Sequence, residues 1–364
     1  MDTPTQIILG AAVGQACCNR TLGRKAVWWG ALGGLLPDLD MVVAHALGPW
    51  GEYHVHRGPT HSVFFGLLVG PLIGLGVWRW YRRTHERGEG VASGARSIHP
   101  GDPILPGVWI LLFTAAILTH PLLDIFTSYG TQLFWPLSTR RIALNGIGII
   151  DPLYTLVLLI ALVVGWRTRR LGPCTGQRAA ALALVLTTAY LFLGFGLNRR
   201  AEAVVREQLS SEGVGEADIR CYPTVFQLFL RRVVVMRPGE IRIGKYTFLD
   251  AGPVRWRQFE PESSVLAEGV LATPLGRSFQ WFSMGCFTSR VVETDQGFVV
   301  EIDDLRFGYP TGLPSRGLWG IRRRFDREGR PISEVERFRR KLPVPIGSLI
   351  RILWQDILGS RVNS

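Results

Sequence analysis

The sequence predicts an α-helical polytopic membrane domain of about five membrane helices, followed by a smaller β-rich extramembrane domain. Hydrophobic residues make up 47% of the 364 positions, which is high for a soluble protein. Four apolar stretches approach the roughly 20 residues that cross a bilayer, at residues 62–78, 104–119, 147–166 and 179–197. After residue 198, short runs of β-branched and aromatic residues replace them. We therefore place the membrane domain at residues 1–198 and the β-rich domain at residues 199–364.

Five membrane helices are expected, at residues 24–47, 62–82, 104–127, 147–166 and 178–197. Basic residues precede the first helix and cluster after the second and the fourth. Because short loops rich in Lys and Arg stay in the cytoplasm, the C-terminal domain is expected outside it. These features predict a multi-pass membrane protein. The first 18 residues lack the basic start and cleavage site of a secretory signal, and we expect a retained amphipathic or half-buried helix there.

Ionisable residues gather at one membrane face on this map. They are Asp38, Asp40, His45, His54, His56, His61, His120, Asp124 and Asp151. The clustering follows from the alternation of the helices and holds if the orientation is inverted. His85 and His99 fall in a loop at the opposite face, where solvated side chains are expected.

The stretch LLPDLD, residues 35–40, places two carboxylates after a proline in an otherwise apolar helix. A carboxylate in the hydrocarbon region is costly, so Asp38 and Asp40 are expected to face a partner, a cavity or an ion. The alternative is a helix end among the lipid headgroups, with Asp38 as a helix cap.

The stretch HRGPTHS, residues 56–62, holds two histidines around a turn. Gly58 permits a tight turn and Pro59 suits a helix entry, which would place His61 in the first turn of the second helix. Imidazole is a common metal ligand, and Arg57 could hold an anionic substrate group. Alternatively, His56 and His61 are interfacial residues that bind headgroups. His54 is expected at the surface.

The stretch THPLLDIFTSYG, residues 119–130, separates His120 and Asp124 by four positions. This spacing places both side chains on one helix face. They could be two metal ligands, a ligand with the carboxylate that orients it, or a plain hydrogen-bonded pair at a helix end.

Together these residues form a mixed nitrogen and oxygen donor set that suits a divalent transition metal, with zinc favoured and manganese or iron possible alternatives. Six candidates exceed the needs of one zinc ion, so either two ions bind or some residues orient the ligands. The five cysteines form no CxxC pair, which argues against a thiolate site. Cys221 and Cys286 could form a disulfide in the outer domain.

The three motifs, in this order, resemble the YdjM-like family of inner-membrane metal-dependent hydrolases over roughly residues 30–142, with the third extending to THPLLDIFTSYGTQLFWPLSTRR. The resemblance implies an integral protein of the bacterial inner membrane with metal-assisted hydrolytic activity and no assigned substrate. It carries metal or catalytic status onto Asp38, Asp40, His56, His61, His120 and Asp124. Many family members have a histidine directly after the second aspartate, where this chain has Met41. His45, one turn later, could substitute for it.

The C-terminal half predicts hairpins in a small antiparallel sheet. Its short apolar runs are TVFQLFLRRVVVM, EIRIGKYTFL, FQWFSMGCFTSRVVE and GFVVEIDDLRFG. Turn residues separate them at 237–240 and 295–297. Residues 345–358 could form a closing amphipathic helix, and Asp303 and Asp304 are expected in a solvated turn. This domain could cover the mouth of the membrane site or recognise a partner.

The leading hypothesis is a membrane hydrolase that uses metal-activated water on an ester or phosphoester of a lipid, envelope precursor or small molecule. Asp40, Asp124 and Arg57 are the expected catalytic residues. The alternative is a non-catalytic metal-binding or scaffold protein; conduction is disfavoured because the inner halves of the helices carry few polar groups. Membrane lipids are the expected partners. Nucleic acid is not expected, because the net charge of +12 comes without a nucleic-acid-binding motif. The oligomeric state is not predicted.

Overall fold

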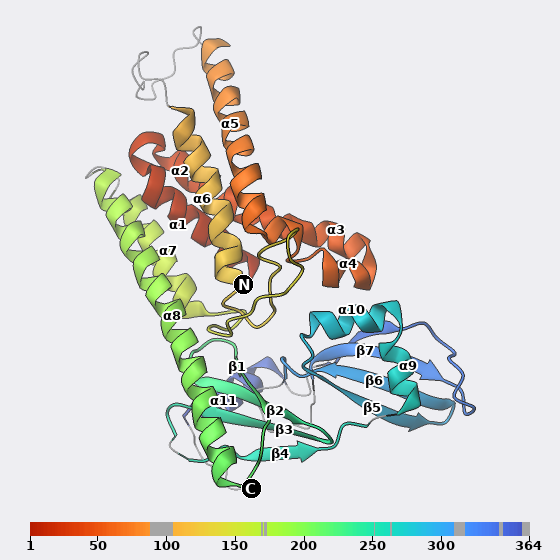
Figure 1. The fold of residues 1–364 in the computed structure, drawn as a ribbon. Coiled ribbons are helices and arrows are strands. Elements are labelled where there is room, and N and C mark those ends of the chain that lie inside the picture. The colour runs from red at the N-terminus through yellow and green to blue at the C-terminus, as the bar shows by residue number, and fades with distance from the viewer. Residues whose placement is uncertain are drawn as a thin grey trace.

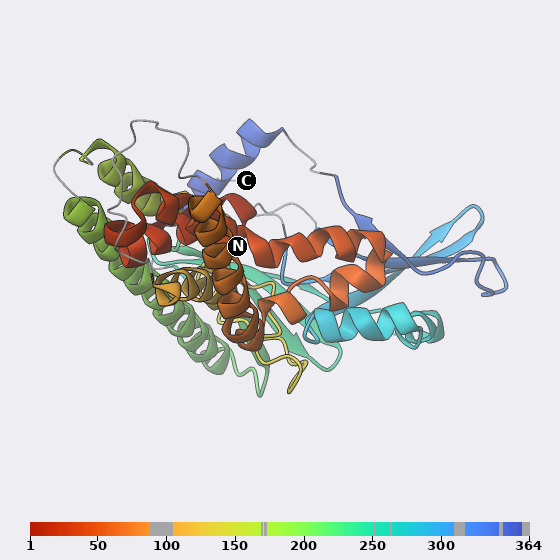
Figure 2. The same ribbon diagram turned by 90° about the horizontal axis from the view of Figure 1, so that it is seen from above.

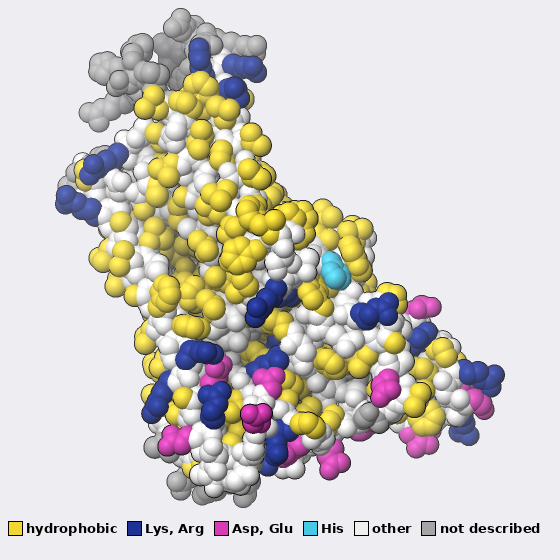
Figure 3. All heavy atoms as spheres, viewed as in Figure 1, with side chains coloured by type: hydrophobic (Ala, Val, Ile, Leu, Met, Phe, Trp, Pro, Cys, Tyr) yellow, Lys and Arg dark blue, Asp and Glu magenta, His cyan; other side chains and the backbone are white. Residues whose placement is uncertain are grey.

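A helical bundle and two β-sheets make up the protein in this computed structural model (Figure 1). The structure describes residues 1–87, 105–168, 170, 173–250, 252–262, 264–308, 317–341 and 345–358. Hydrophobic side chains cover the face of the bundle seen in Figure 3, and Lys and Arg side chains lie at its end away from the sheets. The surface of the sheets carries charges of both signs (Figure 3). This distribution fits a bundle surrounded by lipid and sheets surrounded by water.

The helices of the N-terminal half agree with the predicted membrane domain. They are α1 (Thr3–Leu22), α2 (Arg24–Leu35), α3 (Asp40–Ala46), α4 (Gly48–His54), α5 (Val63–Arg87), α6 (Pro106–Asp124), α7 (Pro152–Arg167) and α8 (Pro173–Ser211), with 3-10 helices η1 (Leu36–Leu39) and η2 (Pro59–His61). Among the described residues, four candidate spans are long and apolar enough to cross a membrane: Arg24–Ala46, Val63–Thr84, Pro106–Asp124 and Cys174–Ser211. The fourth predicted helix, residues 147–166, corresponds to α7, which is apolar but shorter. Helix α8 continues past residue 198, so helix and sheet meet beyond that position.

The expected half-buried helix at the start of the chain is α1, which packs against α2, α6, α7 and α8. Glycines allow α1 and α2 to approach closely: a Cβ atom on Gly10 would lie 2.3 Å from the carbonyl oxygen of Gly30. Small residues at such contacts let backbones pack in a bilayer, where lipid provides little hydrophobic drive for helix association. Helix α1 thus lies inside the bundle and packs against its other helices.

The first predicted membrane helix, residues 24–47, is interrupted. Helix α2 ends at Leu35, and Pro37 lies in the 3-10 helix η1, where its missing N–H costs no α-helical hydrogen bond. Helices α3 and α4 then leave the bundle sideways toward the second sheet, where α4 packs against α10 (Figures 1 and 2). The interruption places Asp38 and Asp40 beside the bundle core instead of along one straight helix.

The C-terminal half contains two four-stranded antiparallel sheets instead of the one small sheet predicted. The first is β1 (Asp218–Pro223), β2 (Leu230–Arg237), β3 (Glu240–Thr247) and β4 (Trp256–Phe259), and the second is β5 (Phe287–Thr294), β6 (Gly297–Asp304), β7 (Trp319–Phe325) and β8 (Glu336–Arg339). Strands follow each other in chain order in both sheets. The predicted turns at 237–240 and 295–297 connect β2 to β3 and β5 to β6.

Helices complete the C-terminal half. Helix α9 (Val265–Leu271) and helix α10 (Pro274–Phe282) lie between the two sheets in the chain, and α11 (Ile346–Ile357) confirms the expected closing helix. The prediction that FQWF, residues 279–282, belongs to a strand is wrong, because these residues end α10. Phe279 and Phe282 alternate with polar residues at helical spacing and pack into the core of the second sheet.

Two further predictions for this half, a disulfide between Cys221 and Cys286 and a solvated turn at Asp303 and Asp304, are wrong. Cys221 and Cys286 are buried and free. Cys221 packs on one face of the first sheet, whereas Cys286 packs with Tyr222, the next residue of β1, whose side chain faces the opposite way. Asp303 and Asp304 are fully buried at the end of β6 instead of solvated in a turn.

The second sheet packs against the membrane domain. Tyr53 of α4 belongs to the core of this sheet, and Arg306 donates hydrogen bonds to the carbonyl oxygens of Ser128 and Tyr129. His54 lies in the same contact, stacked on Trp281 with its Nε2 atom 2.9 Å from Ser278 Oγ, so it is more enclosed than expected. The loop after α6 is therefore fixed from both halves of the chain.

Candidate metal centre

The chain brings four predicted site residues to one buried point. Asp38 comes from η1, His61 from η2, and His120 and Asp124 from the last turns of α6. His61, His120 and Asp124 are at most 1% exposed and Asp38 is 7% exposed. The approach of His61 differs from the prediction, because η2 and an extended Ser62 separate it from the first turn of α5.

Tight backbone packing shapes the turn before His61. Arg57 has a positive φ of 57°, and Gly58 has a φ of −104° with a ψ of −119°. A Cβ atom on Gly58 would lie 2.6 Å from the carbonyl oxygen of His54. Gly58 is thus needed because the backbone passes too close for a side chain, a different reason from the positive φ usually invoked for glycine. Pro59 then starts η2, as its position in the sequence predicted.

Two imidazole nitrogens face each other at the centre of the cluster. His61 Nε2 and His120 Nε2 are 3.0 Å apart. Asp38 Oδ1 lies 3.5 Å from the first nitrogen and 3.4 Å from the second. Asp124 Oδ2 lies 3.4 Å and 3.7 Å from the same two atoms. Asp38, His61 and His120 each offer a ligand atom within 4.8 Å of the others, which makes them a possible metal-binding group.

The outer ring nitrogens of both histidines have acceptor partners. His120 Nδ1 is 2.7 Å from the carbonyl oxygen of Gly34, and His61 Nδ1 is 3.1 Å from Asp40 Oδ2. Each Nδ1 therefore carries the proton, and in the neutral rings both Nε2 lone pairs point at the same place. Two lone pairs at this separation repel each other. A positive charge between them, either a metal ion or a proton, turns the repulsion into attraction.

Carboxylates around His61 favour positive charge there. Burial opposes protonation of the ring, but hydrogen bonds to Asp38 and Asp40 outweigh burial and raise the pKa of His61. In contrast, burial lowers the pKa of His56 despite its hydrogen bond with Asp40. The two histidines of HRGPTHS therefore have different environments. The environment of His61, at the centre, favours a positive charge, whereas that of His56 does not.

Asp40 and His56 lie behind His61, away from the point where the other four residues meet. Asp40 Oδ2 accepts hydrogen bonds from the hydroxyl of Thr60 at 2.7 Å and the backbone N–H of Arg57 at 3.2 Å. Its Oδ1 atom is 2.9 Å from His56 Nδ1. With both oxygens engaged in this way, Asp40 is arranged to orient His61, which is the usual task of a carboxylate hydrogen-bonded to a metal-ligating histidine.

Asp124 combines contacts to cations with an unsatisfied oxygen. Its Oδ1 atom accepts a hydrogen bond from Gln6 Nε2 at 3.0 Å and contacts the Met1 amino group. Its Oδ2 atom is buried without a hydrogen-bond partner, although Arg57 Nε lies 3.2 Å away. A buried oxygen that lacks a hydrogen-bond donor and faces two imidazoles is the arrangement expected of a ligand atom.

Arg57 is held next to this oxygen. Its guanidinium donates a hydrogen bond to Thr127 Oγ1 at 2.7 Å and lies 4.7 Å from the centre of the Tyr129 ring. The side chain is only 5% exposed. Arg57 thus borders the centre on the side of the loop after α6, as a residue that binds an anionic group would.

Some neighbours of the centre carry no sequence signal. Thr3 donates a hydrogen bond to Asp38 Oδ2 at 2.7 Å, and Gln6 reaches Asp124 from the same helix, α1. A polar residue in an apolar helix marks Gln6 as unusual, but nothing local connects it to α6. Met41 and His45 point away: their side chains are half exposed and 89% exposed, so neither lies at the centre. The ring of His85 and all of His99 lie outside the described residues.

Comparison with known proteins agrees with the motifs. The family model described as YdjM inner membrane protein matches residues 1–201. The uncharacterized protein YfhP of Bacillus subtilis is 25% identical over 222 residues, which cover 58% of this chain and 60% of YfhP. The inner membrane protein YbcI of Escherichia coli is 29% identical over 143 residues, 37% of this chain and 69% of YbcI. The match to YfhP therefore spans less than two thirds of that protein's length. No solved structure matches the chain.

Proposed function

The chain belongs to the YdjM inner membrane protein family, and from this premise we propose that it is a metal-dependent hydrolase acting on an ester or phosphoester. The observation that carries the proposal is the pair of facing imidazole nitrogens, His61 Nε2 and His120 Nε2, 3.0 Å apart with both Nδ1 atoms engaged. The unsatisfied Oδ2 atom of Asp124 adds a buried anionic donor at the same point. These features fit a divalent cation better than they fit an apolar helix contact.

The donor set supports a transition metal. His61, His120, Asp38 and Asp124 would hold the ion through two nitrogens and two carboxylate oxygens, a mixture that suits zinc, manganese or iron, of which we favour zinc. A bound ion of this kind supplies a Lewis acid that activates water and polarises an ester or phosphoester oxygen.

The surrounding residues have separate tasks in this proposal. Asp40 keeps the Nδ1 proton of His61 in place, so that the Nε2 lone pair stays directed at the centre. Arg57 lies beside Asp124 and offers a cationic group to an anionic substrate oxygen. Asp124 is the carboxylate nearest to Arg57 at the centre and is our candidate to accept a proton from the attacking water. Asp40 would therefore act through His61 and not on the substrate.

We infer that the substrate reaches the centre from the lipid–water boundary. Helix α3 and the turn after it expose Met41, Val42, Val43 and Leu47, and the loop after α6 exposes Leu137. Apolar side chains exposed beside a membrane-spanning bundle are typical of segments that lie in the headgroup region. A lipid or another amphiphile is therefore our proposed substrate class, and we propose an extracytoplasmic C-terminal domain, since the basic clusters of the bundle lie at its opposite end.

Metal content and hydrolysis, measured on the same preparation, test the proposal. The purified full-length protein in detergent is reconstituted with zinc, manganese or iron and assayed against p-nitrophenyl esters and phosphate esters. We expect about one or two bound ions per chain. Hydrolysis should be lost when a chelator removes the metal and should return when the metal is added back. Asp124→Asn should lose hydrolysis, whereas His45→Ala, a change at an exposed side chain, should retain it. Metal binding without hydrolysis of any ester would instead indicate the non-catalytic metal-binding or scaffold role.

A further inference from the structure

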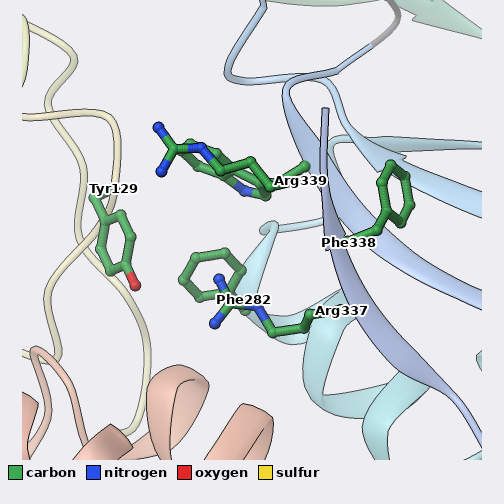
Figure 4. Close-up of a pocket in the computed structure, with 6 residues that line it drawn as sticks. Tyr129, Phe282, Arg337, Phe338 and Arg339 are labelled. Atoms are coloured by element: carbon green, nitrogen blue, oxygen red, sulfur yellow. The ribbon is translucent and has the colours of Figure 1, made fainter. Parts of the chain in front are cut away.

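We propose that a cavity between the loop after α6 and the second sheet binds a phosphate ester group of the substrate; this inference rests on the proposed function. The cavity has a volume of about 320 Å³ and is lined by Tyr129, Phe282, Trp319, Arg337, Phe338 and Arg339 (Figure 4). Tyr129 belongs to the membrane domain, Phe282 to α10 and the others to β7 and β8. Both halves of the chain thus build its walls.

The lining combines two cations with the aromatic rings of Tyr129, Phe282 and Trp319, while the Phe338 ring points to the other side of β8 (Figure 4). Arg339 is exposed, and no hydrogen bond or ion pair engages its guanidinium within the described part of the chain. Arg337 pairs with Glu52 and lies 5.3 Å from the centre of the Tyr53 ring. Arg339 is therefore the guanidinium available to a ligand, while Arg337 is held in place at the opposite side of the opening (Figure 4).

This composition fits a phosphate ester attached to an apolar body. The planar guanidinium fork matches phosphate oxygens in a bidentate way, and charge-assisted hydrogen bonds of this kind are stronger than neutral ones. The rings of Phe282 and Trp319 offer apolar contact beside the charge. A free inorganic anion would gain nothing from these rings, so the expected ligand carries its phosphate on a carbon-containing group.

Tyr129 connects the cavity to the metal centre. On the side of the candidate metal centre, the Arg57 guanidinium lies 4.7 Å from the centroid of the Tyr129 ring, and the His56 ring lies 5.5 Å away. The other side is the cavity, where the Phe282 ring lies 5.0 Å away. Arg306 fixes the loop by donating a hydrogen bond to the Tyr129 carbonyl oxygen at 3.1 Å. A substrate whose phosphate lies in the cavity would therefore have its next groups beside Arg57.

Binding to the metal-stripped protein tests the cavity independently of catalysis. Full-length protein in detergent is treated with chelator and titrated calorimetrically with dihexanoyl phosphatidic acid, glycerol 3-phosphate and dihexanoyl phosphatidylcholine. We expect phosphatidic acid to bind at least about tenfold more tightly than phosphatidylcholine. In phosphatidylcholine one phosphate oxygen is esterified to choline, which lowers the negative charge of the phosphate and adds a quaternary ammonium. Arg339→Ala should weaken this binding about tenfold and Arg339→Lys less, because Lys keeps the charge without the fork.

The matched control is Arg330→Ala, which removes an exposed arginine from the end of the same sheet and should leave the affinity unchanged. Preference for phosphatidic acid over glycerol 3-phosphate identifies a lipid source, and equal binding of both identifies a soluble phosphate ester. Absence of binding by both, or equal binding by wild type and Arg339→Ala, overturns the proposal.

The outcome also separates this proposal from the hydrolase assignment. If the protein binds phosphatidic acid through Arg339 but hydrolyses no ester after metal reconstitution, the cavity assignment stands and the hydrolase proposal fails. If the protein hydrolyses phosphate esters and Arg339→Ala leaves the KM unchanged, the hydrolase proposal stands and the cavity assignment fails.

Discussion

Two buried clusters of charged residues lie on either side of the loop after α6, and they differ in how their charges are matched. In the candidate metal centre, three carboxylates surround two histidines, and Asp124 Oδ2, 3.2 Å from Arg57 Nε, accepts no hydrogen bond. In the second sheet, Asp304 accepts hydrogen bonds from Arg306 Nε at 2.9 Å and Arg306 Nη2 at 2.7 Å. Asp303 likewise accepts from Arg340 Nη2 at 2.7 Å.

The difference favours the first cluster as the candidate site. A buried carboxylate held by an arginine through several hydrogen bonds is satisfied and needs no further ligand. Carboxylates that face neutral imidazole lone pairs leave negative charge for a cation to neutralise. Burial of charge alone therefore does not indicate a metal site; carboxylate oxygens that face histidine nitrogens are the better indicator.

Removal of Arg306 should have the largest effect, and it acts on the fold. Arg306→Ala leaves the fully buried carboxylate of Asp304 with only the backbone N–H of residue 306 and a long contact to Trp319 Nε1. We expect the free energy of unfolding to fall by about 3–5 kcal/mol, as for other broken buried pairs. Chemical unfolding of the detergent-solubilised protein measures this change.

The exposed pair of Arg330 and Asp326 is the control for Arg306. Their side chains are 74% and 27% exposed, and Arg330→Ala should change the free energy of unfolding by less than about 1 kcal/mol. If Arg306→Ala proved equally mild, the second cluster would not be the closed structural pair described above.

The second-largest effect is expected on metal affinity. His61→Ala removes a nitrogen of the facing pair, and we expect metal affinity to fall by more than the roughly 10–100-fold that loss of an orienting residue causes. His56→Ala, from the same seven-residue motif, should stay within about tenfold of wild type, because His56 touches the centre only through Asp40. Metal titration with a competing chelator measures both variants. Equal losses in the two would return His56 to the ligand set.

Asp40→Asn should have an intermediate effect. It keeps the shape of the side chain but removes the charge that holds the Nδ1 proton of His61, so metal affinity should fall by about 10–100-fold. Asp38→Asn, which alters a carboxylate facing both Nε2 atoms, should reduce affinity further. If the two variants lost affinity in the opposite order, Asp40 would be the ligand and Asp38 the residue that orients it.

Much of the fold could be predicted, because hydropathy measures what a bilayer requires. The helices at α5 and α7 begin and end within a few residues of their predicted positions. Hydropathy does not measure backbone hydrogen bonding, and it missed the interruption at Pro37. It also missed that Phe279 and Phe282 lie on a helix, since a short apolar run fits a strand or a helix equally.

The sequence could predict that the residues of the candidate site lie at one face, but not which of them face the histidine Nε2 atoms. Alternating helices gather Asp38, His61, His120 and Asp124 at one face, whatever their side chains do. Which of Asp38 and Asp40 faces the Nε2 atoms depends on the 3-10 turn between them, which has no distinct sequence pattern. The burial of Asp303 was missed because its partner Arg340 lies 37 positions away.

The smallest predicted effect concerns that pair and depends on pH. Burial raises the pKa of Asp303 to about 6, even though Arg340 acts in the opposite direction. Because this pKa lies above the unfolded value, the folded state binds the proton more tightly, and the associated stability is full below the unfolded pKa and lost as the pH rises through about 6. Between about pH 5 and about pH 7.5 the loss should be about 1 kcal/mol, and Asp303→Asn should remove it. Unfolding midpoints at the two pH values measure the change. An unaltered pH dependence in Asp303→Asn would mean that Arg340 keeps Asp303 ionised at both pH values. Every carboxylate of the second cluster would then be paired with an arginine, unlike the carboxylates of the candidate metal centre.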